Sequence, residues 1–238
     1  MNEYGELIVN LYLLEDVYLK DVNDKVSKFL NYIMGNSQYL SEIHKAKCVY
    51  KGYSYSTLYP IESDKIYKAN DIYRIMIRSY DFNFLKEMKD AIHGATNDTF
   101  QEIGSELNVY EHKKINKVTN ITPAVYTIKK NGKYTCWTKK DTESNVEKAI
   151  FNNMIKKYNY INKTNFELKK EDIIDRVEII NNIAITMNYK GIKLLGYKYN
   201  IYFKENSFAQ ELANFITVTG LLEKNSSLGC GFVKAYYK

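Results

Sequence analysis

Residues 220–234 read GLLEKNSSLGCGFVK, and this stretch is the most informative part of the chain for its fold. Three glycines, two serines and Lys224 separate an apolar helical pattern from a closing apolar strand. Glycine lets a backbone approach a ligand closely, and successive backbone N–H groups can bind an anion. The stretch therefore predicts a loop that holds phosphate.

A second informative segment lies near the start of the chain, where His44 is followed by residues 51–56, KGYSYS. Histidine suits proton transfer because its ordinary pKa lies near neutrality. Lys51 adds a positive charge on the strand that the next residues predict. The segment is therefore a candidate for acid–base chemistry beside an anion.

Both segments resemble motifs of the CRISPR repeat-processing endoribonucleases, which belong to the repeat-associated RNA-binding superfamily. The order Gly…Glu-Lys-Asn-Ser…Leu-Gly-x-Gly-x-Val-Lys is similar to the family's C-terminal glycine-rich loop. His44, with lysine, aromatic, hydroxyl, aromatic and serine after it, is similar to the family's catalytic histidine and the strand that follows. The resemblance implies tandem ferredoxin-like (RRM-like) domains and the cleavage of CRISPR repeat RNA.

Apolar periodicity independently predicts an α+β protein. The first half has the order strand, helix, strand, strand, helix, strand, in residues 6–14, 26–34, 50–58, 71–79, 82–92 and 100–115.

The same order repeats in weaker form in the second half. An Asn-Gly turn at 131–132 predicts a hairpin, and residues 193–203 alternate as one long strand. Two ferredoxin-like domains, 1–117 and 118–238, explain this arrangement, each with a four-stranded antiparallel sheet and helices on one face. The first would carry the catalytic histidine and the second the glycine-rich loop.

Composition fits a soluble polyanion binder. The chain has 238 residues, a net charge of +6 and 23 tyrosines, whose rings can stack on unpaired bases. No segment approaches the roughly 20 unbroken apolar residues of a membrane helix. The N-terminus has no basic start followed by an apolar core, so we expect a cytoplasmic protein.

The sequence contains no motif that is typical of a metal site or a nucleotide-binding site. The three cysteines, Cys48, Cys136 and Cys230, are odd in number and far apart, which argues against disulfides and zinc. Cys230 is interpreted as a small filler within the loop. The acidic residues form no Asp-x-Asp cluster, and both common glycine-rich nucleotide motifs are absent. We expect neither a metal nor a cofactor.

Metal-free cleavage of RNA needs two proton transfers and a group that neutralises the phosphoryl charge. The resemblance assigns proton transfer to His44, with its acid and base roles open, and phosphate stabilisation to Lys51. Lys224 is the second candidate for the charge role. The structural alternative for His44 is a cation at the C-terminus of a helix, where the helix dipole favours it.

The family often adds a tyrosine on the first helix, and here this sequence departs from the pattern. The register that best matches that helix places Leu30 at the expected position. Tyr39, which precedes His44 by five residues, is the preferred substitute, and Tyr32 is the alternative. Either tyrosine could instead be ordinary packing.

The RNA backbone is expected to bind the loop. The candidate residues are Gly220, Lys224, Asn225, Ser226, Ser227, Gly229 and Gly231. The expected partner is CRISPR repeat RNA, with other CRISPR-associated effector subunits as further candidates and no membrane. The chain would act as a monomer or a homodimer. Two alternatives remain: a repeat-RNA-binding subunit without cleavage, and a structural RNA-binding protein unrelated to CRISPR.

Overall fold

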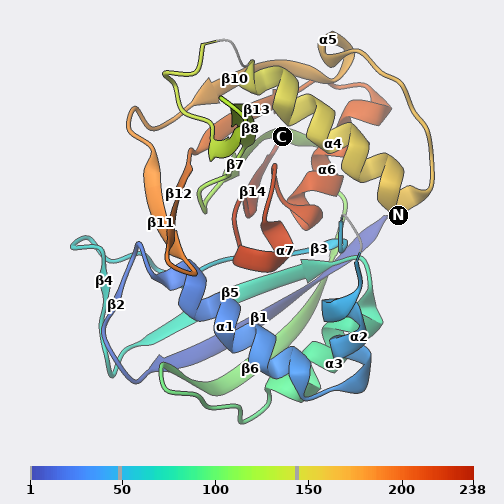
Figure 1. The fold of residues 1–238 in the computed structure, drawn as a ribbon. Helices are drawn as coiled ribbons and strands as arrows, with labels where there is room; N and C mark the ends of the chain where they lie inside the picture. Colours follow the sequence, from blue (N-terminus) through green and yellow to red (C-terminus); the bar gives the residue numbers. More distant parts are fainter. Residues whose placement is uncertain (1, 48–49, 143–144) are drawn as a thin grey trace.

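The computed structural model describes residues 2–47, 50–142 and 145–238. Two units of the same topology lie one above the other, with the first half of the chain below and the second half above (Figure 1). Cys48, one of the three cysteines, lies outside the described residues.

The first unit is a four-stranded antiparallel sheet with the strand order β3-β5-β1-β6. Its elements in chain order are β1 (Glu3–Leu13), α1 (Val22–Gly35), α2 (Gln38–Lys45), β3 (Tyr53–Tyr55), β5 (Ile72–Ser79), α3 (Phe82–Ile92) and β6 (Phe100–Glu111). A short ribbon of β2 (Val17–Tyr18) and β4 (Ile66–Tyr67) is attached beside it.

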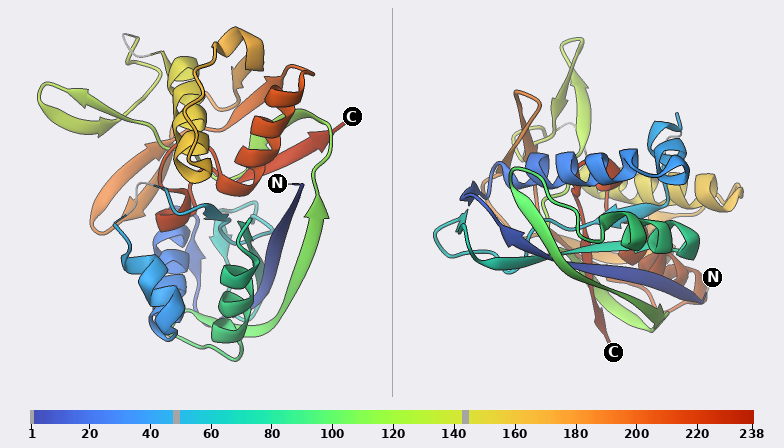
Figure 2. Two further views of the ribbon diagram at one scale, coloured as in Figure 1. Left: turned by 90° about the vertical axis from the view of Figure 1, so that its right-hand side faces the viewer. Right: turned by 90° about the horizontal axis from the view of Figure 1, so that it is seen from below.

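Alternation in β1 builds the core of this unit. Leu7, Val9 and Leu11 are fully buried on one face of the sheet. Phe29 and Ile33 of α1 are also fully buried and belong to the same core. Figure 2, seen from below, shows α1 and α3 on the same side of the sheet. The predicted period-2 strand and period-3.6 helix therefore meet across one apolar layer.

The second unit repeats this plan, with the sheet order β10-β13-β7-β14. Its main elements are β7 (Ile115–Asn120), α4 (Val146–Asn162), β10 (Ile174–Ile179), β13 (Tyr199–Phe203), α6 (Ser207–Thr219) and β14 (Val233–Tyr237). Two hairpins and two short helices are added, namely β8 (Thr127–Lys130) with β9 (Lys133–Cys136), β11 (Ile185–Tyr189) with β12 (Ile192–Gly196), α5 (Lys170–Ile173) and α7 (Asn225–Leu228).

In both units the last strand pairs with the first, and the third lies between the first and the second. This is the βαββαβ arrangement of a ferredoxin-like fold, so the predicted tandem architecture is confirmed. The change from one sheet to the next occurs between Glu111 and Ile115, so the predicted boundary at residue 117 falls within β7.

The prediction of one long strand over residues 193–203 is wrong. Strand β12 ends at Gly196, and β13 begins at Tyr199 in a different sheet. A Cβ atom on Gly196 would lie 2.9 Å from the carbonyl oxygen of Ala124, and Tyr197 exchanges two backbone hydrogen bonds with that residue. The close approach of another backbone thus ends the first strand at a glycine.

Arg78 of β5 joins the two units. Its Nε donates to the Glu6 carboxylate at 2.5 Å, and its Nη1 donates to the carbonyl oxygens of Thr217 and Val233 at 3.0 and 2.6 Å. The guanidinium also lies 4.4 Å from the ring centroid of Phe232. One largely buried side chain thereby bonds to both units.

We expect Arg78→Ala to lower the free energy of unfolding by about 3–5 kcal/mol, because it leaves a buried carboxylate without its partner. The Arg78 and Glu6 side chains are 12% and 9% exposed. Urea unfolding at pH 7 measures the loss. Arg176→Ala is the matched control, since that side chain is 53% exposed and its ion pair should contribute less than about 1 kcal/mol. Equal losses in the two variants would contradict this role.

Candidate functional site

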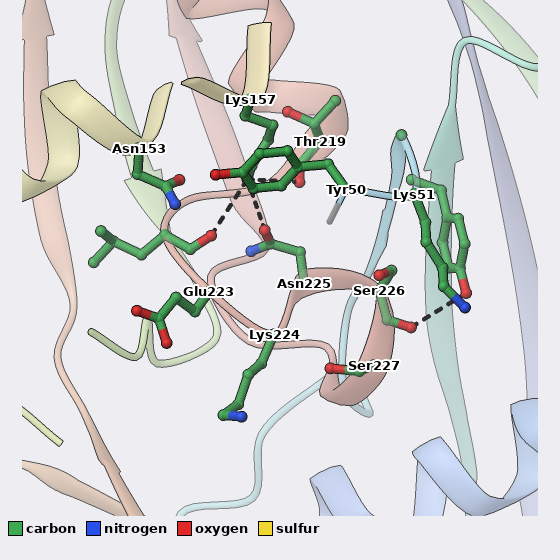
Figure 3. Close-up of a pocket in the computed structure, with 13 residues that line it drawn as sticks. Tyr50, Lys51, Asn153, Lys157, Thr219, Glu223, Lys224, Asn225, Ser226 and Ser227 are labelled. Atoms are coloured by element: carbon green, nitrogen blue, oxygen red, sulfur yellow. Dashed lines mark hydrogen bonds between the residues drawn. The ribbon is translucent and has the colours of Figure 1, made fainter. Parts of the chain in front are cut away.

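A cavity of about 440 Å³ lies between the two units. Residues 50–53 line it from the first unit, and α4 together with residues of the 219–227 segment lines it from the second. Figure 3 shows Lys51 on one side of this cavity and Asn153 on the other. The two segments singled out from the sequence therefore share one site.

The loop before β14 is docked onto the first unit through its carbonyl groups. The Asn23 amide donates to the carbonyl oxygen of Leu228 at 2.8 Å, and the Ser27 hydroxyl donates to that of Ser227 at 2.8 Å. The Tyr53 hydroxyl donates to the carbonyl oxygen of Ser226 at 3.2 Å. Three successive carbonyl groups of α7 are thus held by α1 and β3.

The loop is also cross-linked within itself. The buried Asn225 amide donates to the carbonyl oxygens of Leu221 and Cys230 at 2.9 and 2.8 Å. Gly231 has a φ of +66°, and a Cβ atom there would lie 2.0 Å from the Leu221 carbonyl oxygen. Only glycine fits such a position without strain. The predicted binding residues Asn225 and Gly231 therefore shape the loop from inside.

Most backbone N–H groups of the loop bond within the chain. The bonded ones belong to Gly220, Leu221, Glu223, Leu228, Gly229, Cys230 and Gly231. Those of Leu222, Lys224, Asn225, Ser226 and Ser227 have no partner in residues 2–47, 50–142 and 145–238. All five of these residues line the cavity. The backbone N–H groups that are available to bind an anion therefore lie in the middle of the loop.

Lys157 of α4 holds this loop through hydrogen bonds to its oxygen atoms. Its ammonium lies at 3.3, 2.8 and 3.3 Å from the carbonyl oxygens of Thr219, Gly220 and Leu222, and at 2.7 Å from Oδ1 of Asn225. Burial lowers the pKa of Lys157 to about 7. The four oxygens favour the protonated form, because they can only accept hydrogen bonds.

Sequence reasoning missed Lys157, although a signal was present. The residue lies seven positions after Ile150 and three after Met154, on the apolar stripe of α4. A lysine on an apolar helical face must either reach water or find acceptors inside the protein. Here it finds the carbonyl groups of the loop.

His44 and Lys51 are brought together. His44 lies in the last turn of α2, and the Lys51 ammonium donates a hydrogen bond to its backbone carbonyl oxygen. Lys51 lines the cavity, so the main chain of His44 lies next to a cavity residue. The predicted pair is therefore adjacent, with the imidazole exposed.

The charges around His44 are positive. Partial desolvation of its imidazole lowers the pKa of His44, and the ammonium groups of Lys51, Lys45 and Lys190 lower it further. Lys190 lies in the turn between β11 and β12, so the second unit also contributes to this field. A cluster of cations beside a neutral imidazole is the electrostatic setting that a phosphate diester would fit.

We expect Lys190→Ala to raise the pKa of His44, because removing a positive charge makes the imidazolium less unfavourable. NMR titration of the imidazole measures the change. Lys193→Ala, three residues away on β12, is the control. A pKa that falls, or stays the same, would contradict the arrangement.

Neither of the two candidate tyrosines, Tyr39 and Tyr32, lines the cavity. The Tyr39 hydroxyl donates to the Asp81 carboxylate at 3.1 Å, at the start of α3. Tyr39 and His44 are five residues apart on α2, which places them about 140° apart around its axis. Tyr32 is exposed on α1. Leu30 is buried in the core of the first unit.

Cys230 is buried beside Met187, and burial raises the pKa of its thiol to about 12. This suits the filler role that the sequence suggested. In the part of the chain that the structure describes, no three histidine, cysteine or acidic side chains gather as metal ligands. None of the described helices is both long and apolar enough to cross a bilayer.

Comparison with known families decides the identity of the fold. The model of the C-terminal region of the CRISPR-associated protein Cas6 matches residues 106–235. The chain belongs to the Cas6 family. The Cas6 model covers the second unit with its loop, which is the part of the sequence that first indicated phosphate binding.

Solved structures agree with the Cas6 fold over the whole chain. The protein of a Cas6-related gene from Pyrococcus furiosus has a TM-score of 0.71, with 19% identity and 98% of each chain covered. A RAMP protein described as binding different RNA substrates has a TM-score of 0.70, with 16% identity and 98% and 99% covered.

A third solved structure, the CRISPR endoribonuclease Cse3 bound to a 19-nucleotide RNA, has a TM-score of 0.50, with 9% identity and 98% and 99% covered. At these identities the likeness concerns the fold. No curated protein matches the sequence.

Proposed function

We propose that this Cas6-family chain is a metal-independent endoribonuclease that cuts CRISPR repeat RNA within the precursor transcript. The observation that carries the proposal is the cavity between the units, where Lys51 and the 224–227 segment face one space and His44 lies beside Lys51. Family membership supports the choice of repeat RNA as substrate.

The chemistry follows from these groups. The ribose 2′-oxygen attacks the adjacent phosphorus and loses its proton, and the bond from phosphorus to the 5′-oxygen breaks. The departing 5′-oxygen takes up a proton, so the products are a 2′,3′-cyclic phosphate and a 5′-hydroxyl. His44 performs one of these transfers, and the Lys51 ammonium neutralises the phosphoryl oxygens as their charge grows.

RNA binding is assigned to the middle of the loop. The Lys224 ammonium, the Ser226 and Ser227 hydroxyls and their unpaired N–H groups offer cationic and donor contacts to phosphate oxygens. Asn225 and the three glycines, 220, 229 and 231, act through the shape of the loop, since they are buried within it. The predicted RNA contact of these four residues is therefore indirect.

The test is cleavage of end-labelled repeat RNA in the presence of EDTA. Wild-type protein should still form product, and Lys51→Ala should cut about 10²–10³-fold more slowly. Lys86→Ala, an exposed lysine on α3, is the matched control and should cut at the wild-type rate. Loss of wild-type cleavage in EDTA would contradict the metal-independent route.

A second candidate function is a repeat-RNA-binding subunit that does not cleave, alone or with other effector subunits. One observation favours it: Leu30 is buried at the position of the family's tyrosine, and the Tyr39 hydroxyl is bonded to Asp81. The second proton transfer then has no assigned side chain. Tight binding of repeat RNA without product in the same assay would support this reading.

A further inference from the structure

Asn153 of α4 lies at the wall of the cavity, and its side-chain oxygen has no hydrogen-bond partner among the described residues. This oxygen, Oδ1, is buried. Asn153 lies one helical turn before Lys157 and lines the same cavity. A buried acceptor is costly when it is left unpaired, so this amide is arranged for a donor that comes from outside.

Tyr50 provides an aromatic wall beside this amide. Its ring packs edge-on against Tyr160, with centroids 5.6 Å apart, and the Lys157 ammonium lies 5.9 Å from its centroid. Tyr50 and Asn153 both line the cavity (Figure 3). An aromatic ring beside an amide offers stacking together with hydrogen bonding.

The charge at this end differs from the charge beside Lys51. We call Asn153, Tyr50 and Glu223 the amide end of the cavity. The Lys157 ammonium is enclosed by four oxygens, and the Glu223 carboxylate accepts from the Thr127 N–H and hydroxyl at 3.0 and 2.6 Å. A carboxylate repels phosphate, so the amide end favours a neutral group that donates hydrogen bonds.

We propose that the amide end binds one unpaired nucleobase that carries an exocyclic amino group, with adenine as the best fit. One amino proton is donated to Oδ1 of Asn153 and the other points to the Glu223 carboxylate. The Asn153 amide N–H₂ then donates to the neighbouring ring nitrogen, a pairing in which an asparagine amide matches adenine. Uracil has no amino group and would place a carbonyl oxygen against the carboxylate.

The size of the cavity suits this occupant, since sites for small organic groups have volumes of about 300–1,000 Å³ and this one has about 440 Å³. The base at the amide end and the phosphate beside Lys51 would belong to one RNA strand that crosses the cavity. The inference rests on the proposed RNA-binding function and adds base selectivity to it.

The test measures equilibrium binding of three RNA hexamers to the wild-type protein. They are hexa-adenosine, a hexamer of purine riboside, which is adenosine without its amino group, and hexa-uridine. Hexa-adenosine should bind about tenfold more tightly than the purine hexamer, because only its amino group pairs the buried oxygen. Equal affinity for these two, or no binding of any hexamer, would overturn the inference.

A pair of variants assigns the selectivity to one side chain. Asn153→Ala should remove the difference between the adenosine and purine hexamers. Asn152→Ala, the exposed neighbour on α4, should keep it. Selectivity that persists in Asn153→Ala overturns the role of Asn153, and the wild-type comparison decides by itself if that variant does not fold.

These outcomes are separate from those of the proposed function. The hexamers contain no repeat and the readout is binding, so the result does not depend on cleavage or on His44. One outcome is that the wild-type protein cuts repeat RNA in EDTA and yet binds the adenosine and purine hexamers equally. That result would overturn only the proposed binding of a nucleobase at the amide end. Selective hexamer binding without cleavage of repeat RNA would overturn the nuclease alone.

Discussion

Replacing His44 by alanine should lower the single-turnover rate of repeat-RNA cleavage by about 10²–10⁴-fold, the usual contribution of a positioned acid or base. The affinity for RNA should persist, because the cavity-lining contacts of Lys51, Lys224 and the two serines remain. A rapid-quench assay with protein in excess measures the rate, and filter binding with the same RNA measures the affinity.

The matched control for this change is His93→Ala. His93 is the residue that follows α3, and His44 lies in the last turn of α2. Neither residue belongs to the cavity lining, but the backbone carbonyl of His44 is bonded to the cavity residue Lys51. Its loss should leave the cleavage rate at the wild-type level. If His44→Ala cuts as fast as wild type, the imidazole is only a residue at a helix end, and the proton transfers must be reassigned.

Lys157→Met should reduce both stability and RNA affinity, which is the second large effect. Methionine fills similar space, but the carbonyl oxygens of Thr219, Gly220 and Leu222 and the Asn225 side chain lose their buried donor. We expect a loss of roughly 2–5 kcal/mol in the free energy of unfolding, since each unpaired buried acceptor is costly. Urea unfolding and RNA binding at the same pH measure the two effects.

Lys156→Met separates this effect from a general loss of charge. Lys156 is the exposed neighbour on α4, so its replacement removes a lysine side chain without touching the loop. It should leave stability close to that of the wild type. Should Lys157→Met bind RNA as well as Lys156→Met does, the buried ammonium would have no part in shaping the loop.

Local patterns predicted an α+β protein, and the family resemblance added the tandem arrangement of its two units. Alternation in β1 and the apolar stripe of α1 are strong, single-period signals, and the Asn-Gly turn at 131–132 marks the β8–β9 hairpin that the structure contains. The break near Gly196 was not predictable in this way. It arises because the backbone of Ala124, far away in the sequence, approaches closely at that point.

The sequence indicated which residues to consider for the candidate site, but it indicated the part that each of them plays only incompletely. Spacing and resemblance singled out His44, Lys51 and the loop; the structure places Lys51 and the loop at one cavity, and bonds the backbone carbonyl of His44 to Lys51. They could not show that Asn225 faces into the loop, or that Lys190 reaches the field of His44 from the other unit. The effect of Lys190 on His44 depends on the tertiary fold, because the two residues are more than 140 positions apart in the sequence.

The most direct test of the account replaces a single ribose hydroxyl. Repeat RNA with one 2′-deoxyribose at the cleaved nucleotide is incubated with wild-type protein in EDTA, beside the unmodified RNA. The account predicts equal binding of both RNAs, cleavage of the unmodified RNA to a 2′,3′-cyclic phosphate, and no cleavage of the modified one at that bond. Cleavage of the deoxy-substituted RNA at the same bond would contradict attack by the 2′-hydroxyl and with it the assigned roles of His44 and Lys51.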